Sequence, residues 1–511
     1  MNRLTGIETE YGIVVEGLGA NDWITESIQV VQHCPIPSVG GWNYRGEDPR
    51  KDMRGFSVAH LSTNPDDAQF DAPGAPMRSR EEERSDRVLV NGARFYNDHG
   101  HPEYATPECR SLHDLVAHDK AGERIAFAAA QKYAEKAGRR VSLYKNNTDF
   151  HGASYGTHEG YLMQREVPTD ALIQGLLPFF ATRQIYAGAG KVGTENEPAD
   201  KRVPYQMSQR ADYFSVEASV DTLHNRPLVN TRDEPHATPR KYRRLHVICG
   251  DANMSEYATM LKVGTTCLVI TLLEEGLRPS IRLANPIQAV KQVSRDITLK
   301  KTLECSARPA MTAIEVQRLY QQEALKQLHG ANEETDWVLQ EWESVLTALE
   351  TDIFSLADRL DWVAKYQLLN QFREAEGLDW GDDTMQSLDL AYHDIDTEQS
   401  LYYGLEQAGS MRRLVTDGRI QAAMSCPPSN TRAALRGMFV EKFPRAVQKI
   451  GWNGVAFQHQ GEDYLFDMNP LVEENVSVLN TEMAGAETLE EVIAMIEQRP
   501  KPTPPQNGEG T

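Results

Sequence analysis

Two short strings of this 511-residue chain place charged residues at every second position, which limits the folds available to it. The string GIETEYG carries Glu8 and Glu10, and the string ARFYND carries Arg94, Tyr96 and Asp98. Successive side chains of a β-strand point to opposite faces of its sheet. The spacing therefore predicts two strands whose charged residues share one side of a sheet.

A sheet face lined with such residues indicates a binding site, because isolated buried charges cost several kcal/mol each unless they are neutralised. The turn after the second string, HPEYATPE, adds Glu103 and Glu108. Carboxylates together with phosphate oxygens are the ligands that Mg²⁺ prefers. We therefore predict a site for magnesium and ATP that acts on a carboxylate or carboxamide. The alternative for either strand alone is a solvated edge strand with incidental acids.

Two further polar strings, YKNNTDFHGASYGTHEGYL and VNTRDEPHATPRKYRRLHVICGDANMSE, contain residues suited to such a site. Arginines bind phosphate or carboxylate oxygens through paired hydrogen bonds, which makes Arg210, Arg232 and Arg243 candidates for that role. His246 lies on an apolar strand and is either a ligand or a satisfied core histidine. Neither GxxxxGK[ST] nor a strand-led GxGxxG is present, so metal and arginines are expected to hold the nucleotide.

Composition argues against several classes of protein. The formal net charge of −21 disfavours nucleic acid as a general partner, since phosphate backbones need basic surface. The six cysteines have no CxxC or Cys/His ligand spacing, so neither a zinc site nor a disulfide framework is expected. We find no basic-then-apolar leader and no uncharged apolar run of about 18 residues. A cytoplasmic protein without a membrane partner is predicted.

Changes in amino-acid composition along the chain predict its domain organisation. Prolines 427–428 form a natural hinge between a large catalytic domain over 1–425 and a small domain over 426–498. Residues 42–88 are rich in charge, Pro, Gly and Asp without periodicity, which predicts a mobile loop near the active site. The alternative is a tolerated surface insertion. The ending RPKPTPPQNGEGT, at 499–511, is expected to be a disordered tail.

These strings, with DKAGERI, SQRADYF, LKVGTT and LDWVAK, resemble in chain order the family of Pup ligases and Pup deamidases/depupylases. That family is related to glutamine synthetase and to glutamate–cysteine ligases. The resemblance implies an α+β fold. It consists of a large glutamine-synthetase-like domain with a curved, mainly antiparallel sheet backed by helices, and a small C-terminal α/β domain.

Two features are closer to the deamidase/depupylase branch than to the ligase branch. They are the long insertion at 42–88 and the spacing DHGHPE at 98–103, one residue shorter than the ligase pattern. The resemblance implies ATP- and magnesium-dependent deamidation of the C-terminal Gln of Pup and hydrolysis of the Pup–lysine isopeptide bond. The alternative is a Pup–protein ligase that joins the C-terminal Glu of Pup to lysines. An ATP-binding adaptor and a small-molecule glutamate–amine ligase are further alternatives.

The resemblance also implies roles for single residues. Asp98 matches the catalytic aspartate, as nucleophile or general base. The implied magnesium ligands are Glu8, Glu10, Tyr96, Glu103 and His246. The implied nucleotide contacts are Arg94, Thr106 and Trp452, and Arg232 and Arg243 are further candidates. One departure is Gly160, where the family pattern has Asn after His-Glu. The implied partners of this monomer are Pup, pupylated proteins and the proteasomal ATPase, with neither nucleic acid nor membrane.

Overall fold

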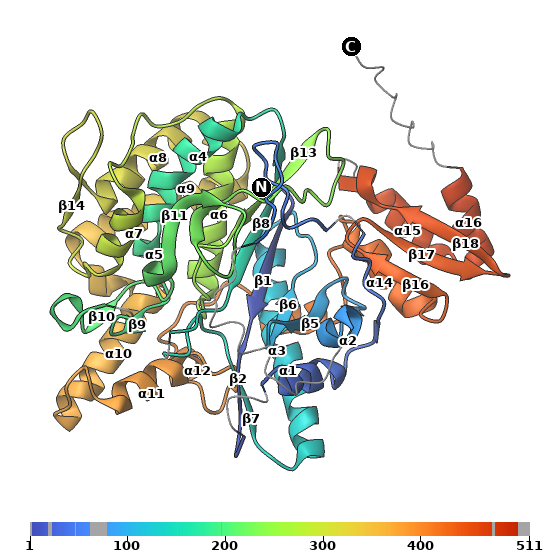
Figure 1. The fold of residues 1–511 in the computed structure, drawn as a ribbon, viewed down its shortest axis with the longest axis horizontal. Coiled ribbons are helices and arrows are strands. Elements are labelled where there is room, and N and C mark those ends of the chain that lie inside the picture. Colours follow the sequence, from blue (N-terminus) through green and yellow to red (C-terminus); the bar gives the residue numbers. More distant parts are fainter. Residues whose placement is uncertain are drawn as a thin grey trace.

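The computed structural model describes residues 3–18, 23–45, 47–61, 79–150, 152–195, 197–472 and 476–498. A seven-stranded sheet in the order β13-β8-β1-β6-β5-β4-β3 lies at its centre, and all neighbouring strands in it are antiparallel (Figure 1). Its strands are β1 (Thr5–Glu10), β3 (Ser38–Val39), β4 (Arg87–Leu89), β5 (Arg94–Asp98), β6 (His101–Ala105), β8 (Thr157–Gln164) and β13 (Tyr242–Val247). The expected mixture of helices with a mainly antiparallel sheet is confirmed.

The remaining strands form smaller sheets. They are β2 (Gly12–Val15), β7 (Val141–Tyr144), β9 (Lys191–Val192), β10 (Tyr205–Gln206), β11 (Phe214–Ser219), β12 (Arg226–Asn230), β14 (Thr302–Leu303), β15 (Met311–Thr312), β16 (Val447–Gly451), β17 (Gly454–His459) and β18 (Glu462–Asp467). The helices are α1 (Trp23–Gln32), α2 (Arg80–Arg84), α3 (Leu112–Ala137), α4 (Thr169–Thr182), α5 (Gln184–Ala187), α6 (Glu256–Glu274), α7 (Pro286–Ser294), α8 (Ala313–Leu328), α9 (Glu333–Thr351), α10 (Asp361–Glu376), α11 (Asp383–Tyr392), α12 (Leu401–Gln407), α13 (Asp417–Ala423), α14 (Ala433–Lys442), α15 (Ser477–Gly485) and α16 (Leu489–Glu497).

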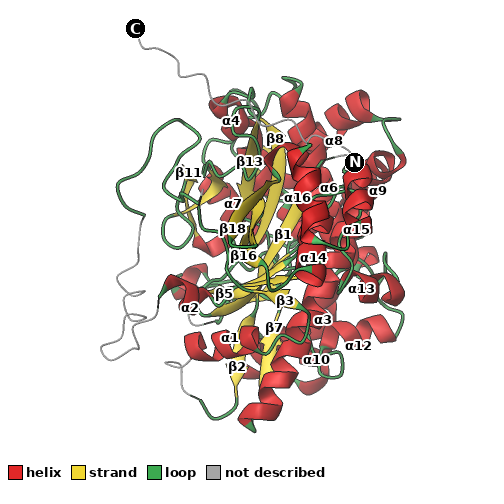
Figure 2. Ribbon diagram, turned by 90° about the vertical axis from the view of Figure 1, so that its right-hand side faces the viewer, coloured by secondary structure: helices red, strands yellow, loops and turns green. Residues whose placement is uncertain are grey.

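The two faces of the central sheet differ because side chains alternate along each strand. Ile7, Tyr161 and Leu245 point to one face, where they join a large apolar core with α4, α6, α8 and α9 (Figure 2). Helix α6 is long and apolar enough to span a membrane, but 94% of the residues concerned are buried within the fold. Its apolar composition therefore serves the core. The opposite face carries the charged residues.

The C-terminal strands and helices form their own layer beside the main sheet (Figure 1). Strands β16, β17 and β18 make an antiparallel sheet that packs with α14 and α16 around Phe439, Phe457 and Phe466. Trp42 and Val88, from much earlier in the chain, belong to the same apolar cluster. The domain boundary at 425/426, the curvature of the main sheet and its likeness to glutamine synthetase stay predictions.

The predicted loop at 42–88 contains order in its described parts. Trp42 is 2% exposed and forms a bridge with Ile450 of β16. Asp52 forms another bridge with Arg232, and α2 closes the segment. Such contacts join irregular segments, so no periodic pattern in the sequence predicts them. Residues 46 and 62–78, like the predicted tail at 499–511, lie outside the described residues, and the mobility of the loop stays a prediction.

Candidate active site

The register of the central sheet brings the expected ligands onto one face. Glu8 lies opposite His158 of β8, and Glu10 lies opposite Glu103 of β6. Glu103 in turn lies opposite Tyr96 of β5. Directly opposed residues of antiparallel strands project to the same side with closely spaced Cβ atoms. Strands β1, β5, β6 and β8, from three separate parts of the sequence, therefore contribute to one polar surface.

Two groups of potential metal ligands result, each with its ligand atoms within 4.8 Å of one another. The first is Glu8, His158 and His246, and the second is Glu10, Asp98 and Glu103. His158 belongs to the polar string YKNNTDFHGASYGTHEGYL, but it was not among the predicted metal ligands. Its signal is the alternation in THEGYL, but the pairing of this strand with β1 is not readable from the sequence.

The first group provides a charged oxygen and an uncharged nitrogen. Burial and the neighbouring Arg244 lower the pKa of His246 to about 3, so its imidazole is neutral. Both of its ring nitrogens are buried without a hydrogen-bond partner among the described residues. Burial alone would raise the pKa of Glu8, but Arg244, His158 and His246 outweigh it and hold that pKa well below its usual range. These donors fit a divalent cation.

The second group concentrates negative charge. Burial, followed by the carboxylates of Glu10 and Glu8, raises the pKa of Glu103 well above its ordinary value. The Tyr96 hydroxyl donates a hydrogen bond of 2.6 Å to Glu103 Oε1, whereas the buried Oε2 has no hydrogen-bond partner among the described residues. A cation at this position would reduce the repulsion between the carboxylates and would give Glu103 Oε2 a partner. The residues therefore fit magnesium here too.

Asp98 stands at the end of β5, where a two-residue turn begins. His99 and Gly100 both have positive φ values, 48° and 89°, as expected in the tight hairpin turn that favours Gly. The Asp98 carboxylate forms an ion pair with Arg84 of α2, and its Oδ1 lies 2.9 Å from His99 Nδ1. The expected catalytic carboxylate thus has two nitrogen partners and lies beside the second ligand group.

A polar cavity of about 1180 Å³, open to solvent, is lined by the whole first ligand group and by Asp98 and Glu103 of the second. Arg232 lines it and is held by hydrogen bonds of 3.0 Å to Val220 O and Thr222 Oγ1. Arg244 also lines it and donates a hydrogen bond of 2.5 Å to Glu8 Oε1. Two cationic side chains therefore face the carboxylates across this space.

Arg243 does not join them, contrary to the expectation. It precedes Arg244 on β13 and points to the opposite face of the sheet, because adjacent residues alternate. Its guanidinium donates to Thr169 Oγ1 at 3.3 Å and to Arg165 O at 2.9 Å. Arg210 is 1% exposed and donates to Ile248 O at 2.7 Å.

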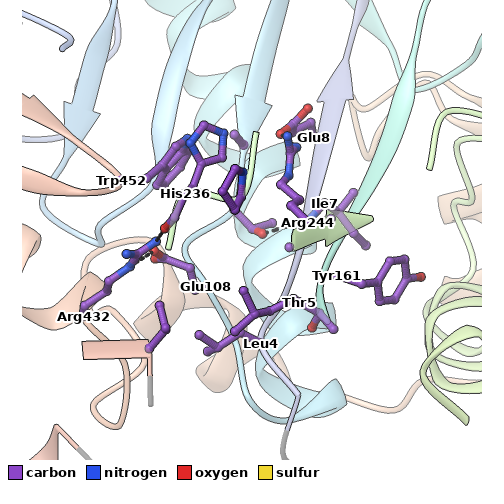
Figure 3. A pocket seen from close by; sticks show the side chains of 17 residues that line it. Leu4, Thr5, Ile7, Glu8, Glu108, Tyr161, His236, Arg244, Arg432 and Trp452 are labelled. Atoms are coloured by element: carbon purple, nitrogen blue, oxygen red, sulfur yellow. Dashed lines mark hydrogen bonds and ion pairs between the residues drawn. The ribbon is translucent and has the colours of Figure 1, made fainter. Parts of the chain in front are cut away.

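A second, mainly apolar cavity of about 600 Å³ adjoins the polar one (Figure 3). Its walls include Leu4 and Leu162, with Thr106 and Trp452 among the expected nucleotide contacts. Arg432 closes one side, where it donates to Glu108 and to the carbonyl of His236 (Figure 3). Four residues line both cavities: Glu8, His236, Arg244 and Trp452. The two cavities therefore adjoin each other, one mainly apolar and the other charged.

Arg94 is sandwiched between two aromatic rings. Its guanidinium carbon lies 4.0 Å from the ring centre of Trp42 and 3.8 Å from that of Tyr96, and it forms an ion pair of 2.6 Å with Asp86. Trp452 packs edge-on against Trp42, with ring centres 5.1 Å apart. Trp452, Trp42, Arg94 and Tyr96 therefore pack in succession. This series connects the C-terminal layer to the metal ligands beside Tyr96. Arg94 borders the polar cavity, but its charge is already neutralised by Asp86.

The model of the Pup-ligase protein family matches residues 3–456. The chain belongs to this family. Among its members, the Pup deamidase/depupylase of Mycolicibacterium smegmatis is 41% identical over 472 residues, which cover 90% of this chain and 93% of that protein. A Pup–protein ligase of Nocardioides sp. is 43% identical over 371 residues, covering 70% of this chain and 81% of that protein.

A solved structure of the family gives the same result for the fold. The Pup ligase PafA in complex with ADP has a TM-score of 0.72 and 34% identity, covering 86% of this chain and 95% of that one. Of the two relatives compared by sequence, the deamidase/depupylase matches more of this chain than the ligase does, 90% against 70%, at similar identity.

The departure of this family member at Gly160 has a visible structural counterpart. A Cβ atom at this position would lie 3.0 Å from Arg244 Nε. Contacts this short are tighter than side chains normally tolerate. The glycine therefore leaves room for Arg244 to lie across β8 and reach Glu8.

Proposed function

We propose that the protein hydrolyses amide bonds at the C-terminus of Pup, using magnesium and ATP. The observation that carries this proposal is that Asp98, which lies beside Glu10 and Glu103, lines one cavity together with Glu103 and the Glu8–His158–His246 group. The family and its deamidase/depupylase relative support Pup as the substrate. The substrates would be the C-terminal Gln of Pup and the isopeptide bond between Pup and a lysine.

The shape of the site supports a nucleoside triphosphate. The apolar cavity, bordered by Trp452 and Thr106, suits a base and ribose, while the polar cavity suits phosphates. Arg232 and Arg244 would bind phosphate or carboxylate oxygens. The two ligand groups would hold magnesium, and the ADP complex of the ligase PafA supports nucleotide binding in the family. When bound, the metal would supply positive charge and polarisation near the scissile carbonyl.

The overall reaction consumes one water: the C–N bond breaks, the acyl carbon gains an oxygen, and the nitrogen leaves as ammonia or as the lysine amine. Asp98 can serve it in two ways. Its carboxylate can attack the carbonyl carbon, after which water hydrolyses the acyl–aspartate and restores Asp98. Alternatively, Asp98 takes a proton from the attacking water and passes it to the leaving nitrogen. Neither route requires net phosphoryl transfer.

The test compares wild type with Asp98→Asn. Each is incubated with ATP, magnesium and either Pup ending in Gln or a Pup–lysine conjugate, and the products are weighed by mass spectrometry. The variant is expected to bind ATP with unchanged affinity and to lose both activities. Full hydrolysis by Asp98→Asn would refute the role of Asp98.

Ligation is the second candidate, favoured by the ligase relative at 43% identity. A ligase would consume ATP stoichiometrically and attach Pup ending in Glu to lysines. The same mass measurement, with Pup ending in Glu and an acceptor protein, separates the two functions. The family resemblance also supports, as parts of this proposal, a cytoplasmic monomer that acts on pupylated proteins beside the proteasomal ATPase.

A further inference from the structure

The Asp98 carboxylate is held by Arg84, a side chain of the 42–88 segment. Arg84 Nη1 forms an ion pair with Asp98 Oδ1, and both residues line the polar cavity. His99 Nδ1 approaches the same oxygen at 2.9 Å. Both of these contacts are to Oδ1, so neither of them engages Oδ2, the other oxygen of the carboxylate.

We propose that Arg84 is a positioning residue that orients Asp98 for attack on the amide or for proton transfer. The proposal rests on the role given to Asp98 in the proposed function. An unrestrained aspartate rotates about two side-chain bonds, and a displacement of about 1 Å of a reacting group can cost about 100-fold in rate. A charged hydrogen bond to one oxygen removes this freedom and directs the other oxygen into the cavity.

The local fold brings Arg84 to this place. Helix α2 starts with a capping box, in which Ser79 accepts from the Glu82 amide and Glu82 accepts from the Ser79 amide. The helix ends immediately after Arg84, where Ser85 adopts a φ of 50°. Only five residues long, α2 has little stability of its own, so tertiary contacts must hold it.

A hydrogen bond holds α2 against the strand that carries Asp98, because Asn97 Nδ2 donates to Glu83 O at 3.0 Å. Lys449 of β16 also forms an ion pair of 2.7 Å with Glu81, but both side chains are largely exposed, so this pair contributes little. The Arg84 guanidinium carbon also lies 5.8 Å from the Tyr96 ring centre. The side chain is therefore directed at Asp98 from a helix anchored to the same strand.

Arg84 differs from the other cations that line the cavity. Arg232 is held by Val220 and Thr222, and Arg244 is paired with Glu8. Arg84 instead contacts the reacting carboxylate itself. Since α2 closes the 42–88 segment, this segment contributes a side chain to the reaction in addition to any effect on access.

The experiment measures kcat and KM for the release of ammonia from the C-terminal Gln of Pup. It compares wild type with Arg84→Gln, Arg84→Lys and Glu81→Gln. Arg84→Gln is expected to lose about 100-fold in kcat with little change in KM. Arg84→Lys should recover part of this loss, because the lysine ammonium keeps the positive charge but lacks the planar guanidinium with its paired donors. Glu81→Gln, the matched control on the same helix, should retain wild-type kcat, because exposed ion pairs contribute little.

Chemical rescue separates positioning from a general structural role. Millimolar guanidinium is expected to restore part of the activity of Arg84→Ala, and the same concentration of sodium chloride is not. Wild-type kcat in Arg84→Gln, or a loss that neither lysine nor guanidinium repairs, would overturn the proposal. Asp98→Asn is measured in parallel. If wild type releases no product, the proposed function fails, and if Asp98→Asn stays active, the role given to Asp98 fails. An active Arg84→Gln beside an inactive Asp98→Asn refutes the Arg84 proposal alone.

Discussion

Magnesium binding to the Glu10–Asp98–Glu103 group is expected to release a proton. Burial and the carboxylates of Glu10 and Glu8 raise the pKa of Glu103 well above its ordinary value of 4.5. Without a cation, Glu103 therefore keeps its proton at pH values where an exposed glutamate would be charged. A metal ion binds the carboxylate and displaces this proton.

The expected magnitude follows from one proton per bound ion. The dissociation constant for magnesium should fall about tenfold per pH unit, or about 1.4 kcal/mol, between pH 4.5 and the pKa of Glu103, and become constant above it. Glu8 and His246 add nothing to this slope, because the pKa of Glu8 is lowered and that of His246 is about 3. The stability of the metal-free fold depends on pH in the opposite direction to magnesium affinity. Because the pKa of Glu103 is raised in the folded state, its contribution to stability is present at low pH and is lost as pH rises through that pKa.

Isothermal titration calorimetry of Mg²⁺ into the protein, in two buffers with different protonation enthalpies, measures affinity and proton release together. Glu103→Gln should bind magnesium more weakly and without this slope. Glu487→Gln, on the exposed surface, is the control and should match wild type. The reasoning is refuted by a wild-type affinity that stays constant between pH 4.5 and about 7, or by equal proton release in Glu103→Gln.

Two further substitutions test the nucleotide end of the site. Trp42→Ala should destabilise the protein by about 3–5 kcal/mol and raise KM for ATP, because Trp452 loses its neighbour; an unchanged thermal midpoint would contradict this packing role. Gly160→Asn should displace Arg244 and raise KM for ATP several-fold. Arg243→Gln, on the opposite face of the sheet, is the control, and equal KM values for it and Gly160→Asn would show that the position of Arg244 is not needed.

The part of the site that lies on single strands could be predicted from the sequence. Alternation is a local property, so the shared face of Glu8 and Glu10 follows from GIETEYG alone. The pairing of strands is not local. His158 lies opposite Glu8 only because β8 adopts one particular register against β1, and a shift by one residue would have turned it away.

The same limit explains the choice of Arg243 over Arg244. The string RKYRR offers adjacent arginines, and only the register of β13 against β8 decides which one faces the cavity. For residues 42–61, the order lies in contacts such as the packing of Trp42 against Arg94, which leave no repeating pattern in the sequence. Patterns reveal regular elements, while irregular segments are ordered by partners that the sequence does not identify.

The shared wall of the two cavities has a consequence for biosynthesis. Glu8 leaves the ribosome more than 400 residues before Trp452, which faces the same space. Strand β1 can pair with β6 and β8 while the chain is still growing, since both follow it early. The nucleotide end, however, is completed only when the C-terminal layer has been made. A chain that stops before β16 would keep every carboxylate of the two ligand groups and still lack one side of its nucleotide pocket.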